Sequence, residues 1–241
     1  MYLYLLIMNN KKPTISIIIP TYNEEKIINK TLDQFKSIPK EIEVILVDGK
    51  SNDDTIKIAK QYTNITILQS QKKGRAAQMN YGSNQAKGDI LLFLHADSIL
   101  PKKYLQEIKN AIQQKNIIGG AFKITFPINL LAYKLINLYS NVRAKIFKIY
   151  HGDQAIFITK KIFNNIGTYP DVPLMEDVLL SEKMKKTGAT ILLPFPVTTS
   201  ERRIKKTGIT KSIILYFLIK SLHKLHVSPH TLAHIYKKTA Q

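Results

Sequence analysis

The residues best placed to do chemistry follow an apolar run, Ile90 to Leu94, which leads directly into His95, Ala96 and Asp97. An apolar run of this length between breakers predicts a buried strand. Side chains two residues apart on a strand point to the same face, so His95 and Asp97 form a potential ligand pair. Such a pair is typical of a site at the carboxyl edge of an open α/β sheet. A solvated turn, in which Asp is common, is the alternative.

Two earlier apolar runs also end in polar residues. The run ISIIIP leads into TYNE, and the run EVILVD leads into GKSNDDT. Because the carboxyl ends of parallel strands open on one edge of the sheet, three such endings favour one shared site over three separate turns. A basic loop adds Lys72, Lys73, Gly74 and Arg75 before a helix start, where phosphate binds readily. Taken alone, this loop is also explained as an ordinary solvated segment.

The pair Glu176 and Asp177 opens a predicted helix that ends in lysines and Gly188. Like charges and partial burial would raise the pKa of Asp177 toward a range that suits a general base. Two acids at a helix start also compensate the helix dipole without any chemistry. The segment YHGDQAIF holds a further acid, Asp153, which could bond hydroxyl groups of a ligand or simply lead into a strand.

The elements that must position these residues alternate between strand and helix patterns. Strands are predicted over 15–20, 43–48, 65–70 and 90–94, with a helix capped by Asn23 after the first and a helix over about 74–86 before the fourth. This alternation predicts an α/β fold with a mostly parallel central sheet flanked by helices. The less regular second half contains strand patterns over 117–126 and 155–159. We expect one domain over 14–207 and a basic helical appendage over 208–241.

Composition narrows the function classes. The chain has 241 residues, of which 44% are hydrophobic, and no cysteine, so disulfides and thiolate metal sites are excluded. Its 36 Lys and Arg against 17 Asp and Glu give a formal net charge of +19, which attracts polyanions unless it only reflects lineage bias. The apolar start MYLYLLIM is too short to span a bilayer and lacks the features of a signal peptide. We expect a cytoplasmic protein.

Two segments combine apolar and basic residues. A helical stripe runs from Leu131 to Ile149, and Ile213 to Ile219 lies between lysines. Such helices lie in a membrane interface or pack on the sheet, and both alternatives stay open. We expect at most peripheral contact with an anionic membrane, at its cytoplasmic face. No nucleic-acid motif is visible, and we expect no nucleic-acid partner.

Five blocks carry a family resemblance: SIIIPTYNE, VILVDGKSNDDT, KGRAAQMNYGSNQAKGDILLFLHAD, GDQAIF and PLMEDVLLSEKM. In order and spacing they resemble family-2 glycosyltransferases of the GT-A fold, which is Rossmann-like, over about residues 14–230. They are most similar to the subfamily described as radical-SAM/selenodomain-associated transferase 2. The resemblance implies a nucleotide-diphosphate sugar bound by residues 14–100, an acceptor bound by 101–207, and transfer to a hydroxyl or a lipid-linked phosphate.

The resemblance also assigns residues. The donor-binding positions that it implies are Pro20, Thr21, Tyr22, Glu24, Asp48, Gly49, Ser51, Gly74, Arg75, Asn80, His95 and Asp97. Positions near the acceptor or the phosphates are Asp153, Gln154, Arg202 and Arg203, with His151 and Gly152 beside them. The catalytic pair is Asp177 as general base and Glu176 in support, and the reaction inverts the anomeric carbon.

Asp97 matches the last carboxylate of the family's Asp-x-Asp motif, so it is the expected ligand for Mg²⁺ or Mn²⁺. His95 stands where most relatives have the first aspartate. Because Mg²⁺ prefers oxygen ligands, we expect His95 to contact the donor or a metal-bound water. A nucleotidyltransferase of similar fold and a non-enzymatic membrane or nucleic-acid binder are the alternative functions. The segment PTYNE after the first strand argues against a nucleotidyltransferase. Only the net charge of +19 supports a non-enzymatic binder.

Overall fold

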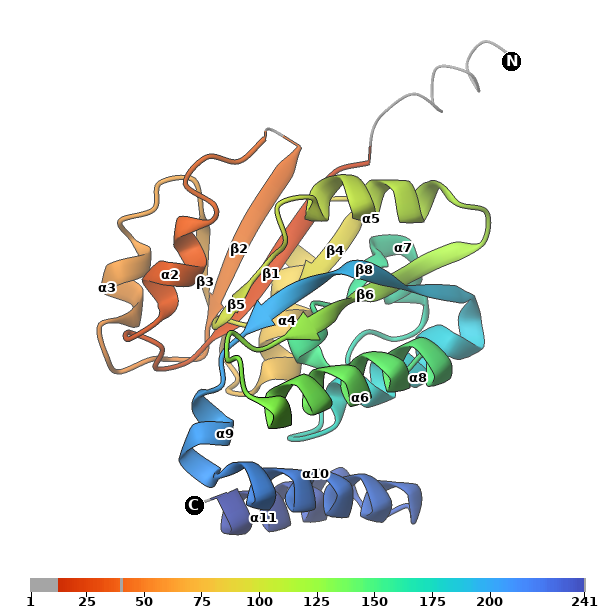
Figure 1. The fold of residues 1–241 in the computed structure, drawn as a ribbon. Coiled ribbons are helices and arrows are strands. Elements are labelled where there is room, and N and C mark those ends of the chain that lie inside the picture. Colours follow the sequence, from red (N-terminus) through yellow and green to blue (C-terminus); the bar gives the residue numbers. More distant parts are fainter. Residues whose placement is uncertain (1–12, 40, 241) are drawn as a thin grey trace.

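The computed structural model describes residues 13–39 and 41–240, and these form one eight-stranded mixed sheet with helices on both faces (Figure 1). The strand order is β3-β2-β1-β4-β7-β6-β8-β5. The strands are β1 (Ile15–Thr21), β2 (Ile42–Asp48), β3 (Thr66–Gln69), β4 (Ile90–Phe93), β5 (Ser98–Ile99), β6 (Ile117–Thr125), β7 (Phe157–Thr159) and β8 (Ala189–Thr199). The helices are α2 (Ile28–Asp33), α3 (Thr55–Ala59), α4 (Arg75–Gln85), α5 (Tyr104–Gln113), α6 (Leu131–Phe147), the 3₁₀ turn η1 (Gly152–Gln154), α7 (Lys160–Asn165), α8 (Glu176–Thr187), α9 (Arg202–Thr207), α10 (Ile209–Lys224) and α11 (Pro229–Ala240).

Strand β1 shows why both faces of the sheet are covered. Its residues alternate between two cores: Ile17 and Ile19 pack in a layer with α2 and α5, whereas Ile18 packs in a layer with α4 and α8. A strand that is buried on both faces reads as the continuous apolar run seen in the sequence. The predicted α/β fold with flanking helices is therefore confirmed.

The direction of the strands changes across the sheet. Strands β1 to β4 pair in parallel, as expected, and β6 pairs in parallel with β8. Strand β7 runs antiparallel to both β4 and β6, and β5 runs antiparallel to β8. The carboxyl ends of β1, β2 and β4 consequently share one edge, which is where the sequence placed its polar residues.

The expected cap at Asn23 is wrong. Helix α2 begins only at Ile28, and Asn23 lies in the left-handed region with φ of 53°. Its side-chain Oδ1 accepts a hydrogen bond from the backbone N–H of Asn52, and its own N–H donates to Ser51 Oγ. Asn23 thus joins the loops after β1 and β2 at the carboxyl edge, and this use competes with capping.

The C-terminal helices pack against the N-terminal end of α8. Helices α10 and α11 form a hairpin beneath the rest of the molecule (Figure 1), and Gly208, with φ of 84°, separates it from α9. Leu215, Ile219 and Leu232 pack on Met175 and Val178, which flank the acidic pair of α8. Among residues 13–39 and 41–240 no helix has the length and apolarity to cross a membrane. The apolar start of the chain lies outside the described residues.

Helix α6 exposes its apolar stripe and turns the opposite face toward the sheet. Five leucine, valine and isoleucine side chains of the predicted stripe, Leu131, Leu135, Leu138, Val142 and Ile146, are between 44% and 72% exposed. The opposite face meets β6, where Asn141 pairs with the backbone of Ile124 through Oδ1 at 2.8 Å and Nδ2 at 3.1 Å. Packing of the stripe on the sheet, one of the two alternatives for this helix, is therefore wrong.

Candidate active site

The first part of the site is the edge formed by β1 and β2. Thr21 and Asp48 are register partners at the ends of these strands, and the N–H of Gly49 donates to the carbonyl of Thr21 at 2.8 Å. The buried Gln78 of α4 donates from Nε2 to the carbonyls of Thr21 and Val47. A side chain at Gly49 would meet the Gln78 amide at 3.1 Å, so the glycine permits this close approach. Gln78 therefore fixes the two strand ends together.

Asp48 shapes the turn that follows β2. Its carboxylate accepts hydrogen bonds from Ser51 Oγ at 2.6 Å and from Ser51 N–H at 3.0 Å. Above this turn Tyr22 is 45% exposed, with Lys73 Nζ 4.8 Å from the ring centroid. The hydroxyl of Thr21 is buried and has no hydrogen-bond partner among the described residues. The edge thus offers an exposed aromatic ring and a free hydroxyl beside a fixed backbone.

The second part lies beyond β4. Arg202 of α9 donates from Nη2 to Glu24 Oε2 at 2.8 Å and lies 3.6 Å from Asp97 Oδ2. Burial raises the pKa of Glu24, and Arg202 partly offsets that effect. One arginine from the end of the chain therefore links acids that follow β1 and β4.

The third part joins β4 to α8 through η1. A methyl group at Gly152 would lie 2.5 Å from His95 Nε2, so only glycine leaves room for the His95 side chain, and Asp177 Oδ2 lies 3.6 Å from the same position. The N–H of Gly152 donates to Asp177 Oδ2 at 2.7 Å, and the N–H of Val178 donates to Oδ1 at 2.7 Å. His95 and Asp177, which are far apart in sequence, therefore face one small space.

The two acids of α8 have different partners: Glu176 pairs with Arg75, and Asp177 bonds the N–H of Gly152. Arg75 donates from Nε to Glu176 Oε1 at 2.8 Å, while the buried Oε2 of Glu176 has no partner among the described residues. Burial raises the pKa of Glu176, against the opposing effect of Arg75. Glu176 is thus a buried anchor for Arg75 at the start of α4.

The expectation of a raised pKa at Asp177 is wrong. Burial does act in that direction, but His151, Arg75 and the two backbone N–H donors outweigh it and hold the pKa below its usual value. The backbone donors stabilise the charged form directly, because they bond to the carboxylate itself. Asp177 is consequently ionised at neutral pH and can accept a proton.

The pKa values of three neighbouring groups are also shifted: those of His95 and His151 are lowered, and that of Asp153 is raised. Burial, with Arg75 as a further cause, lowers the pKa of His95 to about 3, and burial and Arg143 lower that of His151 to about 4. Burial and Asp177 raise the pKa of Asp153 to about 6. Both histidines are therefore neutral near pH 7, and His95 can donate or accept a hydrogen bond without charge.

Several predicted residues lie beside the site in supporting positions. The amide of Asn80 bonds to both the N–H and the carbonyl of Tyr169, and so holds the loop before α8. Gln154 is fully buried and bonds to Arg143, His151 and Phe122. Pro20 lies inside β1. Gly74, with φ of 125°, precedes α4, and a Cβ at this position would meet no described atom within 4 Å. Arg203 stacks on Tyr236 of α11, 5.6 Å from the ring centroid.

Sequence reasoning missed two buried residues that organise the site. Gln78 shares a helical face with Met79, Gly82 and Ala86, so a polar residue on a buried face was a readable sign. Arg143 belongs to the segment from Leu131 to Ile149, which the sequence described only as apolar and basic, yet it is 4% exposed and bonds Ile149 and Gln154. Its burial depends on η1 and could not be read from the helix alone.

Curated relatives match much of the chain. It is 30% identical over 178 residues to "Glycosyltransferase AglE" of Haloferax volcanii, covering 68% of this chain and 58% of AglE. It is 34% identical over 116 residues to "Undecaprenyl-phosphate 4-deoxy-4-formamido-L-arabinose transferase" of Photorhabdus laumondii, covering 44% of this chain and 36% of that protein. The chain thus spans less than two thirds of each of these relatives.

Solved structures share the fold. TarS of S. aureus in complex with UDP-GlcNAc gives a TM-score of 0.64 at 20% identity, over 83% of this chain and 65% of that one. The mannosyltransferase PcManGT of Pyrobaculum calidifontis, in complex with GDP-Man and Mn²⁺, gives 0.64 at 19% identity, over 89% and 65%. These likenesses confirm the GT-A fold. Residues 16–169, which span the β1, β2 and β4 edge with its polar residues, match the family described as "Glycosyl transferase family 2", and the chain belongs to that family.

Proposed function

We propose that the chain is an inverting glycosyltransferase that uses a nucleotide-diphosphate sugar and a divalent metal ion. The observation that carries the proposal is the meeting of His95, Gly152 and Asp177 in one space, with Arg75 paired to the neighbouring Glu176. Relatives of similar fold bind UDP-GlcNAc or GDP-Man, which supports a donor of this class. The narrower subfamily stays a prediction.

The donor would lie across the carboxyl edge of β1, β2 and β4. Tyr22 offers an exposed ring on which a base can stack, and Asp48 with Ser51 forms the turn beside the ribose. Lys73 and Arg75 supply positive charge toward the diphosphate. Breaking the bond between sugar and phosphate adds negative charge to the leaving group, and these fixed cations stabilise that charge.

The donor set around Asp97 fits a hard cation. Asp97 is partly exposed, and Glu24 and Asp153 are close enough for its charge to raise their pKa values. Within the described residues no three His, Asp or Glu side chains form a ready metal cage. Mg²⁺ and Mn²⁺ commonly use one or two carboxylates together with substrate phosphates, so the remaining ligands would come from the donor. When bound, the ion neutralises charge on the departing diphosphate.

Asp177 would act as the general base. Its carboxylate is ionised and held by two backbone donors, and about 15% of its side chain stays accessible to an acceptor. Removal of a proton from the acceptor allows its oxygen to displace the nucleoside diphosphate from the opposite face of the sugar. A single displacement of this kind inverts the anomeric carbon.

A thermal-shift panel of UDP, GDP and their sugars, with and without Mn²⁺, tests the proposal. One nucleotide should raise the melting temperature, and the metal ion should increase that shift, because ligands that bind only the native state stabilise it. Hydrolysis of the same sugars should then show the same nucleotide preference. Absence of stabilisation by every nucleotide would contradict the proposal.

A further inference from the structure

Arg202 reaches the carboxyl edge of the sheet because two strand ends pair beside it. Ser98 of β5 and Thr199 of β8 are register partners, and Ser98 Oγ donates to Thr199 Oγ1 at 3.3 Å. This pairing brings the chain that leaves β8 to the turn that holds Asp97, and α9 begins there at Arg202. The topology of the sheet therefore places Arg202 next to Asp97, although the two residues are far apart in sequence.

One guanidinium nitrogen of Arg202 reaches the carboxylates of two different turns. Its Nη2 lies 2.8 Å from Glu24 Oε2 and 3.6 Å from Asp97 Oδ2. Glu24 is fixed in its turn, because its N–H donates to Thr55 Oγ1 at 2.8 Å. The side chains of Glu24 and Asp97 are 23% and 24% exposed, whereas that of Arg202 is 48% exposed. Arg202 is thus the most accessible member of this group.

Helix α9 leaves the Arg202 side chain able to change partners. None of the six residues of this helix is buried. The next residue, Arg203, lies over the ring of Tyr236 on α11, 5.6 Å from its centroid, and this contact links the helix to the C-terminal hairpin. The Arg202 side chain can therefore turn away from Asp97 while the backbone of α9 keeps its place.

A divalent ion and Arg202 compete for Asp97. Mg²⁺ binds carboxylate oxygens at about 2.1 Å, so an ion on Asp97 Oδ2 would stand close to the guanidinium. Two cations at such a distance repel each other unless further anions surround them. Within the described residues no group of three His, Asp or Glu side chains offers those anions. The protein alone is consequently a poor host for the ion at this carboxylate.

A nucleoside diphosphate changes this balance in two ways. Its phosphate oxygens form bidentate, charge-assisted hydrogen bonds with a guanidinium, which are stronger than bonds between neutral groups. Phosphate oxygens are also the ligands that complete the coordination of Mg²⁺ in many sites that have only one or two carboxylates. The diphosphate thus offers Arg202 another anion and offers the metal ion its missing ligands.

We propose that Arg202 is a built-in counter-ion of the metal site, which opposes binding of a metal ion at Asp97 until a nucleoside diphosphate draws the arginine away. The inference rests on the proposed use of a nucleotide sugar with a divalent ion, and it describes how that site is regulated. Its consequence is an order of binding: the free ion binds weakly, and the nucleotide and the ion raise each other's affinity.

Binding of Mn²⁺ in the absence of nucleotide tests the proposal, with electron paramagnetic resonance of the unbound ion as the readout. Arg202→Gln should bind Mn²⁺ about tenfold more tightly than wild type, because the competing cation is gone. The double variant Arg202→Gln with Asp97→Asn should lose this gain, which would locate the gain at Asp97. A tighter, saturable site is not the result of misfolding, since a misfolded variant would lose the arrangement of the two carboxylates.

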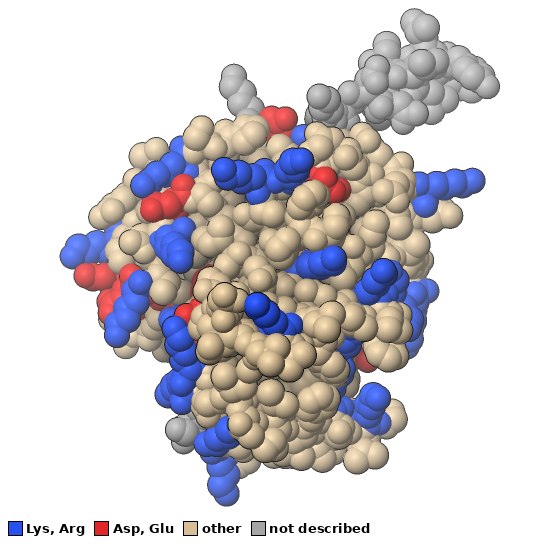
Figure 2. All heavy atoms as spheres, viewed as in Figure 1, with Lys and Arg blue, Asp and Glu red and all other residues tan. Residues whose placement is uncertain are grey.

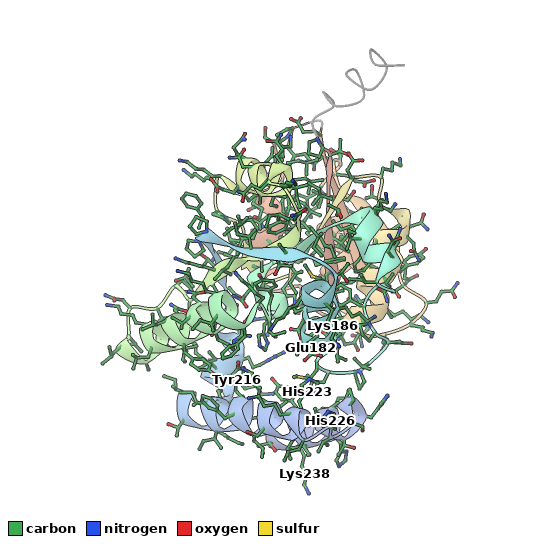
Figure 3. The ribbon with its side chains drawn as sticks, turned by 90° about the vertical axis from the view of Figure 1, so that its right-hand side faces the viewer. Glu182, Lys186, Tyr216, His223, His226 and Lys238 are labelled. Atoms are coloured by element: carbon green, nitrogen blue, oxygen red, sulfur yellow. The ribbon has the colours of Figure 1, made fainter. Side chains whose placement is uncertain are left out.

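General charge needs its own control, because Figure 2 shows several Lys and Arg side chains on the side of the molecule that carries α9. Lys206→Gln removes one charge from α9 itself. Lys238→Gln removes one from α11, where Figure 3 shows this side chain pointing away from the rest of the molecule. Neither variant should change the Mn²⁺ affinity more than about twofold, because exposed charges at a distance are screened. The same gain in Lys206→Gln as in Arg202→Gln, or no gain in Arg202→Gln, would overturn the proposal.

Titration calorimetry with nucleotide separates this inference from the proposed function. A nucleoside diphosphate should increase the Mn²⁺ affinity of wild-type protein, and this increase should be about tenfold smaller in Arg202→Gln, because part of the coupling comes from the arginine. An equal increase in both proteins would overturn the order of binding alone. A gain of Mn²⁺ affinity in Arg202→Gln without binding of any nucleotide would contradict the proposed function and support Arg202 as the counter-ion.

Discussion

At the scale of single residues, Arg202 is the side chain with the widest influence on the donor edge. It pairs with Glu24 at 2.8 Å and approaches Asp97 at 3.6 Å, and thereby compensates Glu24, whose charged form burial and the charge of Asp97 disfavour. A cation at Asp97 would share this carboxylate with Arg202 or shift the arginine toward Glu24. Either way, Asp97 should matter for metal-dependent binding.

Asp97→Asn should lower the affinity for a nucleoside diphosphate about tenfold or more when Mn²⁺ is present, and should change it little without metal, because the amide is a poorer ligand for a hard cation. Titration calorimetry measures both affinities. Asp89→Asn, at the opposite end of the same strand, is the control. Unchanged affinity of Asp97→Asn with metal would show that Asp97 is not a ligand.

His151 should make the protein sensitive to acid. Its pKa is about 4 in the folded chain and 6.5 ordinarily, so the unfolded chain binds the proton more tightly and stability is lost as pH falls below about 6.5. Between pH 7 and pH 5 this amounts to about 2 kcal/mol, partly opposed by Asp153, whose raised pKa acts in the other direction. His151→Gln should reduce this fall in denaturant titrations and leave the part due to His95, whose pKa is also lowered, to about 3, whereas the exposed His230→Gln should not change it.

At the scale of elements, the sequence predicted those strands and helices whose pattern of buried residues appears directly as an apolar run or stripe. Strands β1, β2 and β4 are buried on both faces, so their apolar runs were readable. Strand β8 was not predicted, because Pro194 and Pro196 interrupt its pattern; the structure accommodates them at a register shift opposite Phe122 and Lys123. The orientation of α6 also could not be predicted from the sequence, because an apolar stripe alone does not determine which face of a helix packs on the sheet.

Asn141 should be the residue that holds α6 in this orientation. Asn141→Ala removes both hydrogen bonds to the buried backbone of Ile124, and we expect a loss of about 1–3 kcal/mol in the free energy of unfolding. Chemical denaturation measures this loss. Asn110→Ala, on the exposed surface of α5, should lower the free energy of unfolding much less. Equal losses in the two variants would argue against a structural role for the Asn141 amide.

The candidate site was predicted in its residue types and less well in its geometry. The sequence placed Glu176 and Asp177 correctly at the start of a helix. His95 and Asp97, expected as a pair on one strand face, instead lie in the turn after β4 and meet different partners. The direction of the pKa shift at Asp177 could not be foreseen, because the Gly152 amide that lowers it arrives from another segment. For the same reason the link from Arg202 to Glu24, 178 positions away, was invisible.

At the scale of the whole molecule, the C-terminal hairpin packs directly behind the acidic pair. Leu215, Ile219 and Leu232 contact Met175 and Val178, which lie on either side of Glu176 and Asp177. The division into a domain over 14–207 and an appendage over 208–241 stays a prediction. The packing supports the idea that the hairpin helps to set the position of Asp177.

Leu232→Ala should loosen the hairpin, because Leu232 is fully buried and truncation of such a side chain costs about 2–5 kcal/mol. We expect a lower melting temperature and slower sugar transfer with little change in nucleotide affinity, since the cluster contains no described residue of the β1 and β2 edge. Leu225→Ala, at an exposed position, is the matched control. An equal fall in nucleotide affinity would mean that the hairpin supports the whole fold instead.

The central claim is that Asp177 removes the proton in a transfer that starts from a bound nucleotide sugar. Release of nucleoside diphosphate, with water as the acceptor, tests it in wild-type protein, Asp177→Asn and Glu176→Gln once the preferred nucleotide is known. We predict that Asp177→Asn keeps near-normal donor affinity and is slower by about 100-fold or more, roughly 3 kcal/mol in the barrier, with a smaller loss in Glu176→Gln. Asp177→Asn that hydrolyses the donor as fast as wild type, or a reversed ranking of the two variants, would contradict the account.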